Sequence, residues 1–130
     1  MPQVLIVDDD EDIRVVLRIA LEDAGYAVHE AANGAAALDV LRQADSAMVV
    51  LVDYVMPRVD GAGLLDAAAA LSPSAPQHAY ILITASPQRI SPDFTAQLDA
   101  RGVIVVSKPF DMTAILEVVA RASAQLVQVS

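Results

Sequence analysis

The chain has 130 residues, a formal net charge of −9 and no cysteine, which suits a single domain with its own core. The lack of cysteine excludes disulfides, thiolate chemistry and zinc–thiolate sites, and the negative charge disfavours direct binding to nucleic acid. Apolar runs are too short to span a bilayer, and residues 1–7 lack the basic start and long apolar core of a signal peptide, so we expect a cytoplasmic protein without membrane contact.

The first half of the chain alternates short apolar strands with amphipathic helices. A strand over about 3–7 precedes a helix whose apolar residues recur every three or four positions. Asp10 is expected to cap the start of that helix, and Gly25 is expected to end it. A short strand over about 27–30 follows, and Asn33 is expected to cap the next helix.

The second half continues the alternation. The strand over 48–53 is apolar on both faces, which is typical of a central parallel strand. The remaining elements are, in order, a helix over about 62–71, a strand over 80–84, a helix capped by Ser91 with Pro92 in its first position, a strand over 103–107 and a helix capped by Asp111. Five strand–helix units predict a doubly wound α/β fold with a parallel sheet and right-handed crossovers. We assign residues 1–122 to this domain and 123–130 to a C-terminal tail.

Polar groups stand where the apolar strands end. Asp8 and Asp9 follow the first strand, Asp53 closes the third, Thr84 closes the fourth and Lys108 follows the fifth. The carboxyl ends of parallel strands meet at one edge of an open sheet, which is where ligands bind. Carboxylates that lie close together repel one another unless a divalent cation or a lysine neutralises them. The set suits transfer of a phosphoryl group to a carboxylate with the help of Mg2+.

Each of these residues also has a simpler interpretation. Asp8 and Asp9 could be loop residues before a helix, because aspartate is favoured at helix N-termini, and Asp53 could belong to an ordinary turn. Thr84 could merely end a strand, and Lys108 could lie on the surface. Their placement at the ends of four strands favours one common site.

The motifs in combination resemble the receiver (CheY-like) domain of two-component response regulators over residues 3–122. The matching segments are Asp8-Asp9, Asp53-Tyr54-Val55-Met56-Pro57, Asp60-Gly61, Thr84-Ala85 and Lys108-Pro109-Phe110. The resemblance implies a flavodoxin-like (βα)5 fold with strand order 2-1-3-4-5. It also implies a signalling module rather than an enzyme, which accepts a phosphoryl group from a phosphohistidine on a histidine kinase or histidine phosphotransfer protein.

The resemblance further implies how the site would hold Mg2+. Asp9 would be a direct ligand, and Asp8 would act mainly through water. Asp53 would be the phosphorylated residue and would supply both a metal-binding oxygen and the attacking oxygen. The backbone carbonyl of Val55 would complete the protein ligands.

On the phosphate side, the resemblance assigns three residues. Lys108 would pair first with Asp53 and then with the phosphoryl oxygens. The Thr84 hydroxyl would bond to the new phosphate, together with the backbone N–H of Ala85. The bond between Lys108 and Pro109 is expected to be cis, which a tertiary amide tolerates.

Two features depart from the family pattern. Val105 stands three residues before the lysine, where receivers commonly carry a Tyr or Phe ring that follows the threonine inward on phosphorylation. Lys108 comes 24 positions after Thr84, slightly more than in similar receivers, and the surplus falls in 85–91. We therefore expect the chemistry at Asp53 to be separable from its output. A pseudo-receiver that binds a partner without phosphorylation is the alternative function.

Two further positions flank the path of attacking water in similar receivers. They are Val55, two residues after the nucleophile, and Ser86, two residues after Thr84. Valine cannot orient water through a hydrogen bond, so we expect a persistent phosphoaspartate. A phosphatase of the haloacid dehalogenase type is a third class, but its chemistry needs a second acid where Val55 stands.

The face made by the fourth helix, the fifth strand and the fifth helix is the expected contact for a downstream protein or for a second copy in a homodimer. No output domain follows the receiver pattern. The chain is therefore either a single-domain regulator or a domain excised from a larger regulator or hybrid kinase, and the sequence leaves both possibilities open.

Overall fold

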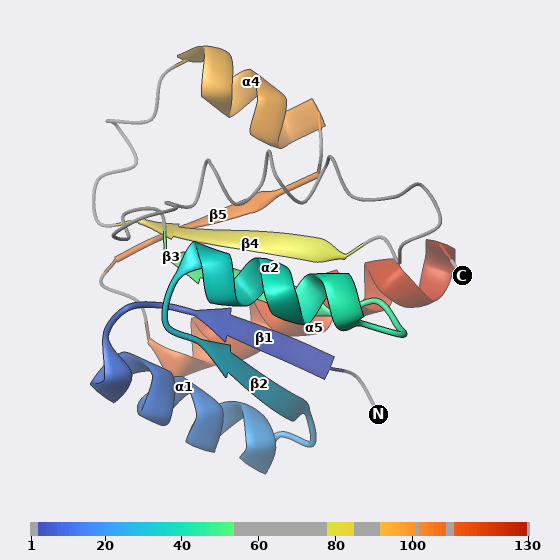
Figure 1. The fold of residues 1–130 in the computed structure, drawn as a ribbon. Helices are drawn as coiled ribbons and strands as arrows, with labels where there is room; N and C mark the ends of the chain where they lie inside the picture. Colours follow the sequence, from blue (N-terminus) through green and yellow to red (C-terminus); the bar gives the residue numbers. More distant parts are fainter. Residues whose placement is uncertain (1–2, 54–77, 85–91, 101, 109–110, 130) are drawn as a thin grey trace.

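The computed structural model describes residues 3–53, 78–84, 92–100, 102–108 and 111–129. In chain order the elements are β1 (Gln3–Val7), α1 (Glu11–Asp23), β2 (Ala27–Ala31), α2 (Gly34–Gln43), β3 (Val49–Asp53), β4 (Ala79–Thr84), α4 (Pro92–Ala100), β5 (Ile104–Ser107) and α5 (Met112–Val129) (Figure 1). The helix expected over about 62–71 lies outside the described residues. None of the described helices is long and apolar enough to cross a bilayer.

All five strands form one parallel sheet in the order β2-β1-β3-β4-β5, which confirms the predicted order. One row of register partners runs through all five strands. It consists of Glu30, Ile6, Leu51, Ile81 and Ile104. Because the strands are parallel and in this register, their carboxyl ends finish at the same edge.

Helices cover both faces of the sheet, so the inner strands are buried on both sides. On one face, Val4 and Ile6 of β1 belong to a cluster that α1 and α5 cover. On the other face, Leu5 and Val7 belong to a second cluster, to which α2 and Leu98 of α4 contribute. This alternation along β1 explains why its sequence is a continuous apolar run.

The two ends of α1 follow the predicted signals. The Asp10 carboxylate accepts hydrogen bonds from two main-chain N–H groups of the first turn, at 2.9 and 3.4 Å. At the other end, Gly25 has a φ of +99°, a conformation that costs glycine little. The Tyr26 N–H then donates to the Leu21 carbonyl at 3.1 Å, which closes the helix.

The other caps agree with the sequence where the structure describes them. The Asn33 side chain accepts a hydrogen bond from the main chain of α2 at 2.8 Å. The Asp111 side chain does the same for α5 at 2.7 Å. Pro92 is the first residue of α4, whereas Ser91, its expected cap, lies outside the described residues.

The C-terminal end differs from the expectation of a tail over 123–130. Helix α5 continues through Val129, and Leu126 still packs against the core cluster that contains Ile115 and Val119. The reason is local, because the chain after Asp111 contains neither glycine nor proline that would stop a helix. Residues 123–129 are therefore part of the last helix.

Candidate functional site

Three carboxylates converge at the carboxyl edge of the sheet. One carboxylate oxygen from each of Asp8, Asp9 and Asp53 lies within 4.8 Å of the others. Asp8 and Asp9 follow β1, Asp53 ends β3, and these two strands are neighbours in the sheet. Asp8 is buried, Asp53 is partly buried and Asp9 is exposed. The cluster is therefore buried at Asp8 and open to solvent at Asp9.

Lys108 reaches this cluster from β5. Its Nζ lies 3.5 Å from Oδ2 of Asp53, and both side chains are mostly shielded from solvent. The Lys108 N–H donates to the Thr84 carbonyl at 2.8 Å, which continues the pairing of β4 and β5 just past the end of β5. The ammonium group is thereby placed against the carboxylate that ends β3.

Burial makes Asp8 difficult to ionise. The pKa of its carboxyl group is raised, first because burial disfavours the charged form. The Asp10 N–H, which donates to Asp8 Oδ1 at 2.9 Å, opposes that shift, while the negative charge of Asp53 raises the pKa further. The positive charge of Lys108 acts in the opposite direction. One lysine thus faces three carboxylates.

This donor set fits a magnesium ion. Mg2+ prefers oxygen ligands, binds through one or two carboxylates and keeps several of its waters. The exposed Asp9 leaves room for such waters, and a cation among these oxygens would relieve the cost of ionising the buried Asp8. Val55, whose carbonyl was expected to complete the ligands, lies outside the described residues.

Thr84 lies at the same edge. It ends β4 and is buried, and it directly follows Ile83, the register partner of Asp53. Ala85 and Ser86, which were expected to bind phosphate and to flank the path of water, lie outside the described residues. So does Pro109, and with it the expected cis bond.

Val105 lies on β5 with 39% of its surface exposed. It is the register partner of Leu82, and residues two apart in a strand face the same side of the sheet. Val105 and Thr84 therefore belong to the same face. A half-exposed valine stands where the family pattern has an aromatic ring.

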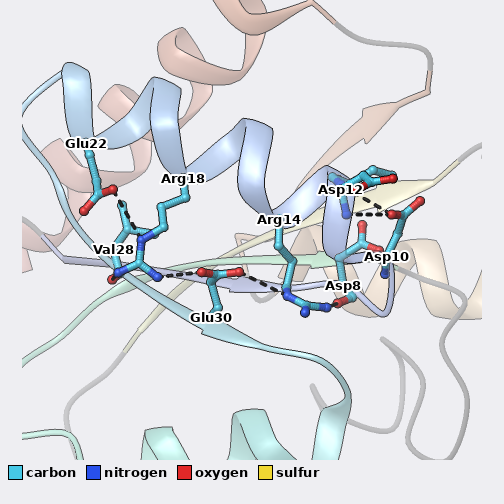
Figure 2. A network of polar contacts seen from close by, with 9 residues as sticks. Asp8, Asp10, Asp12, Arg14, Arg18, Glu22, Val28 and Glu30 are labelled. Atoms are coloured by element: carbon cyan, nitrogen blue, oxygen red, sulfur yellow. Dashed lines mark hydrogen bonds and ion pairs between the residues drawn. The ribbon is translucent and has the colours of Figure 1, made fainter.

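The sequence analysis missed two residues of this site: Arg14, which contacts Asp8, and Glu30, which pairs with Arg14. The Arg14 guanidinium donates from Nη1 to the Asp8 carbonyl oxygen at 2.7 Å and pairs with Glu30 at 3.1 Å (Figure 2). The available signal was a pair of arginines, Arg14 and Arg18, four residues apart on one helix, followed by a glutamate inside the next strand. Such spacing places both arginines on one side of the helix.

Comparisons with known proteins identify the family of the chain. A family model described as response regulator receiver domain matches residues 4–120. The response regulator receiver protein CpdR of Brucella abortus is 36% identical over 113 residues, which cover 86% of this chain and 88% of that protein. A receiver domain structure from Methanospirillum hungatei superposes with a TM-score of 0.84 over 100% of this chain and 99% of that one, at 24% identity, and supports the fold.

Another relative is much longer. The sensor kinase CckA of Brucella abortus is 41% identical over 63 residues, which cover 48% of this chain but only 7% of that protein. The likeness to CckA is therefore a likeness to one small part of a kinase. The match of the family model over most of the chain, together with the similarity to CpdR, establishes that this chain belongs to the response regulator receiver domains, a family of signalling modules.

Proposed function

We propose that this receiver domain is a phosphoryl-accepting switch in which Asp53 is the acceptor. The observation that carries the proposal is the convergence of Asp8, Asp9 and Asp53 within 4.8 Å, with the Lys108 ammonium 3.5 Å from Asp53. A lone aspartate at a strand end would not need two further carboxylates beside it. A bound cation would offset the mutual repulsion of the three carboxylates.

In the proposed reaction, a carboxylate oxygen of Asp53 attacks the phosphorus of a phosphohistidine on a histidine kinase or phosphotransfer protein. A phosphorus–oxygen bond forms as the phosphorus–nitrogen bond breaks, and the histidine nitrogen keeps the electron pair and takes up a proton. Bound Mg2+ would neutralise charge on the transferred group. Lys108 pairs with Asp53 before transfer and meets a phosphoryl oxygen afterwards, and Thr84 would donate its hydroxyl hydrogen to another.

For the metal, we assign Asp9 and Asp53 as direct ligands and Asp8 as a ligand acting through water, with the carbonyl of Val55 as a further ligand. The exposure of Asp9 supports a direct role, because its side chain is open to an ion arriving with water. The burial of Asp8 supports its assignment as a ligand that acts through water.

The proposed output surface consists of α4, β5 and α5. We propose that it contacts a downstream protein, or a second copy of the chain, in the cytoplasm. The partly exposed Val105 lies on β5, and it shares a face with Thr84. Val105 also supports the second candidate, a pseudo-receiver that binds its partner without phosphorylation, because it carries no ring that could follow the threonine.

Treatment with acetyl phosphate and Mg2+, followed by intact-mass measurement, separates the two candidates. We expect the mass of one phosphoryl group to be added to the wild type and to Asp99→Asn, a control at an exposed aspartate on α4. Asp53→Asn should remain unmodified. A wild type that stays unmodified, and that gives no spectral change with beryllofluoride and Mg2+, would overturn the acceptor role and favour the pseudo-receiver.

A further inference from the structure

Arg14 lies on the side of α1 that faces β2 and the end of β1 (Figure 2). Its side chain is only 15% exposed. The guanidinium bonds in two directions, from Nη1 to the carbonyl oxygen of Asp8 at 2.7 Å and from Nε to Oε1 of Glu30 at 3.1 Å. The planar fork of an arginine permits both bonds at once.

The partner of Arg14 is itself held in place. Arg18, one helical turn further along α1, donates from Nη1 to the second carboxylate oxygen of Glu30 at 2.5 Å. Arg18 also donates from Nη2 to the Val28 carbonyl at 3.2 Å, which ties the same arginine to the main chain of β2. Glu30 therefore lies between two guanidinium groups, and this row of charges fixes the direction of the Arg14 side chain.

The result at the acidic site is that Asp8 is held at three points. Its N–H donates to the Ala31 carbonyl at 3.2 Å, its Oδ1 accepts from the Asp10 N–H at 2.9 Å, and its carbonyl oxygen accepts from Arg14. The two main-chain bonds fix the position of the Asp8 backbone, and with it the direction of the Cα–Cβ bond. The bond from the Asp10 N–H to Oδ1 then holds the side-chain rotamer, so the three contacts together fix where the carboxylate points.

We infer that Arg14 is a positioning residue of the acidic site, which holds the main chain of Asp8 and is itself locked by Glu30 and Arg18. The inference rests on the proposed Mg2+ site. Repulsion among Asp8, Asp9 and Asp53 pushes the loop after β1 away from β3 when no cation is present. The hydrogen bond from Arg14 resists that displacement, so the carboxylates stay preorganised for Mg2+.

The test measures Mg2+ affinity by isothermal titration calorimetry in a matched set of variants. Arg14→Gln should weaken Mg2+ binding by about tenfold, the lower end of the effect of residues that support metal ligands. Glu30→Gln should weaken it less, because the amide can still accept a bond from Arg14. Arg14→Lys should recover little of the loss, since one ammonium cannot reproduce the two-directional fork. The control is Arg42→Gln, which removes an exposed arginine paired with Asp39 on α2 and should leave the affinity unchanged.

Thermal unfolding provides a second measurement. A merely structural role for Arg14 would lower the midpoint of unfolding in EDTA, yet leave the rise on adding Mg2+ as large as in the wild type. A positioning role reduces that rise, because stabilisation by a ligand depends on its dissociation constant. Equal Mg2+ affinity in Arg14→Gln and wild type, or an undiminished rise, would overturn the inference.

Two safeguards keep the outcome decisive. Should Arg14→Gln fail to fold, Glu30→Gln and Arg14→Lys answer the same question, and wild-type affinity in both would also overturn the inference. The failure of the proposed function has a different signature. In that case the wild type itself binds no Mg2+ and is not modified by acetyl phosphate. The inference alone fails when the wild type binds Mg2+ and is modified, and the variants bind Mg2+ with the same affinity as the wild type.

Discussion

Asp8 is buried beside other carboxylates, which the folded protein tolerates only at a cost in stability. Its pKa is raised from the ordinary value of 3.8, mainly because burial disfavours the charged form. A raised pKa in the folded state means that the unfolded state releases the proton more readily. The resulting loss of stability is therefore complete above the folded pKa and absent below the unfolded one. In the metal-free protein this cost therefore grows as the pH rises above 3.8.

Removing that charge should stabilise the metal-free protein. We expect Asp8→Asn to raise the free energy of unfolding at neutral pH by about 0.5–2 kcal/mol, as commonly found where a functional site sacrifices stability. Asparagine keeps a side-chain oxygen that can accept the hydrogen bond from the Asp10 N–H. Urea denaturation in EDTA measures the difference, which should shrink as the pH falls toward 3.8.

Asp9→Asn is the matched control for that substitution, because Asp9 is exposed, and its effect should be smaller. Adding Mg2+ should stabilise the wild type more than Asp8→Asn. An Asp8→Asn variant that is less stable than the wild type in EDTA would contradict the account.

His78 is a second residue whose burial has a measurable consequence. Its Nδ1 accepts a hydrogen bond from the Met48 N–H at 3.0 Å, which only an unprotonated nitrogen can do. Burial lowers the pKa of His78 below its ordinary value of 6.5. The unfolded state therefore binds a proton first as the pH falls, and stability decreases below about pH 6.5.

The prediction is that His78→Gln flattens part of this pH dependence. Glutamine is not titratable, so the free energy of unfolding of the variant should change less between about pH 7 and pH 5, the range in which histidine normally titrates. His29→Gln serves as the control because His29 is exposed and its side chain bonds to Gln3 in an exposed contact. Denaturation series at several pH values measure the slopes. Equal slopes for His78→Gln and wild type would count against the role of burial.

At the scale of elements, the α1 cap provides the clearest local test. The Asp10 carboxylate accepts bonds from the first turn of the helix, so Asp10→Ala should lower the free energy of unfolding by about 1 kcal/mol. Asp23→Ala, at the opposite end of the same helix, should be neutral or slightly stabilising, because a negative charge there opposes the helix dipole. Chemical denaturation of the two variants gives the comparison, and equal losses would argue against capping.

Elements that depend on local chemistry were predictable from the sequence. Asp10, Gly25 and Asn33 mark helix ends by hydrogen bonds and backbone conformation within a few residues, and the structure has them in those roles. The end of α5 was misjudged, since no residue there enforces a stop and Leu126 continues the packing.

The acidic site was predictable from the sequence, because its residues stand at strand ends. The Arg14–Glu30 pair that supports the site was not predictable. Strand ends in a parallel sheet share an edge, so Asp8, Asp53 and Lys108 could be brought together from their positions alone. Arg14 and Glu30 pair across α1 and β2. Their contact depends on how the helix packs on the strand, and a periodic pattern treats both charges as solvent-facing.

At the scale of the whole molecule, the acceptor edge and the proposed output surface meet along β5. Lys108 follows that strand and pairs with Asp53, while Val105 lies within it and is partly exposed. The β5 strand is therefore adjacent to the acceptor site and also forms part of the proposed output surface. A branched aliphatic side chain has few rotamers, so Val105 offers no large movement that could carry a signal from Thr84.

Val105→Tyr tests whether chemistry and output are separable. We expect phosphorylation of Asp53 by acetyl phosphate to be unchanged, because the substitution leaves the carboxylates and Lys108 untouched. Association of the chain with itself or with a partner should change in the phosphorylated form by about tenfold, equivalent to ~1.4 kcal/mol, since a ring at 105 adds a large contact on β5. Analytical ultracentrifugation with and without beryllofluoride measures self-association. Val15→Tyr is the control, as a similarly exposed valine on α1, a helix that is not one of the three elements of the proposed surface. Association identical to the wild type in both states would mean that β5 does not carry the output.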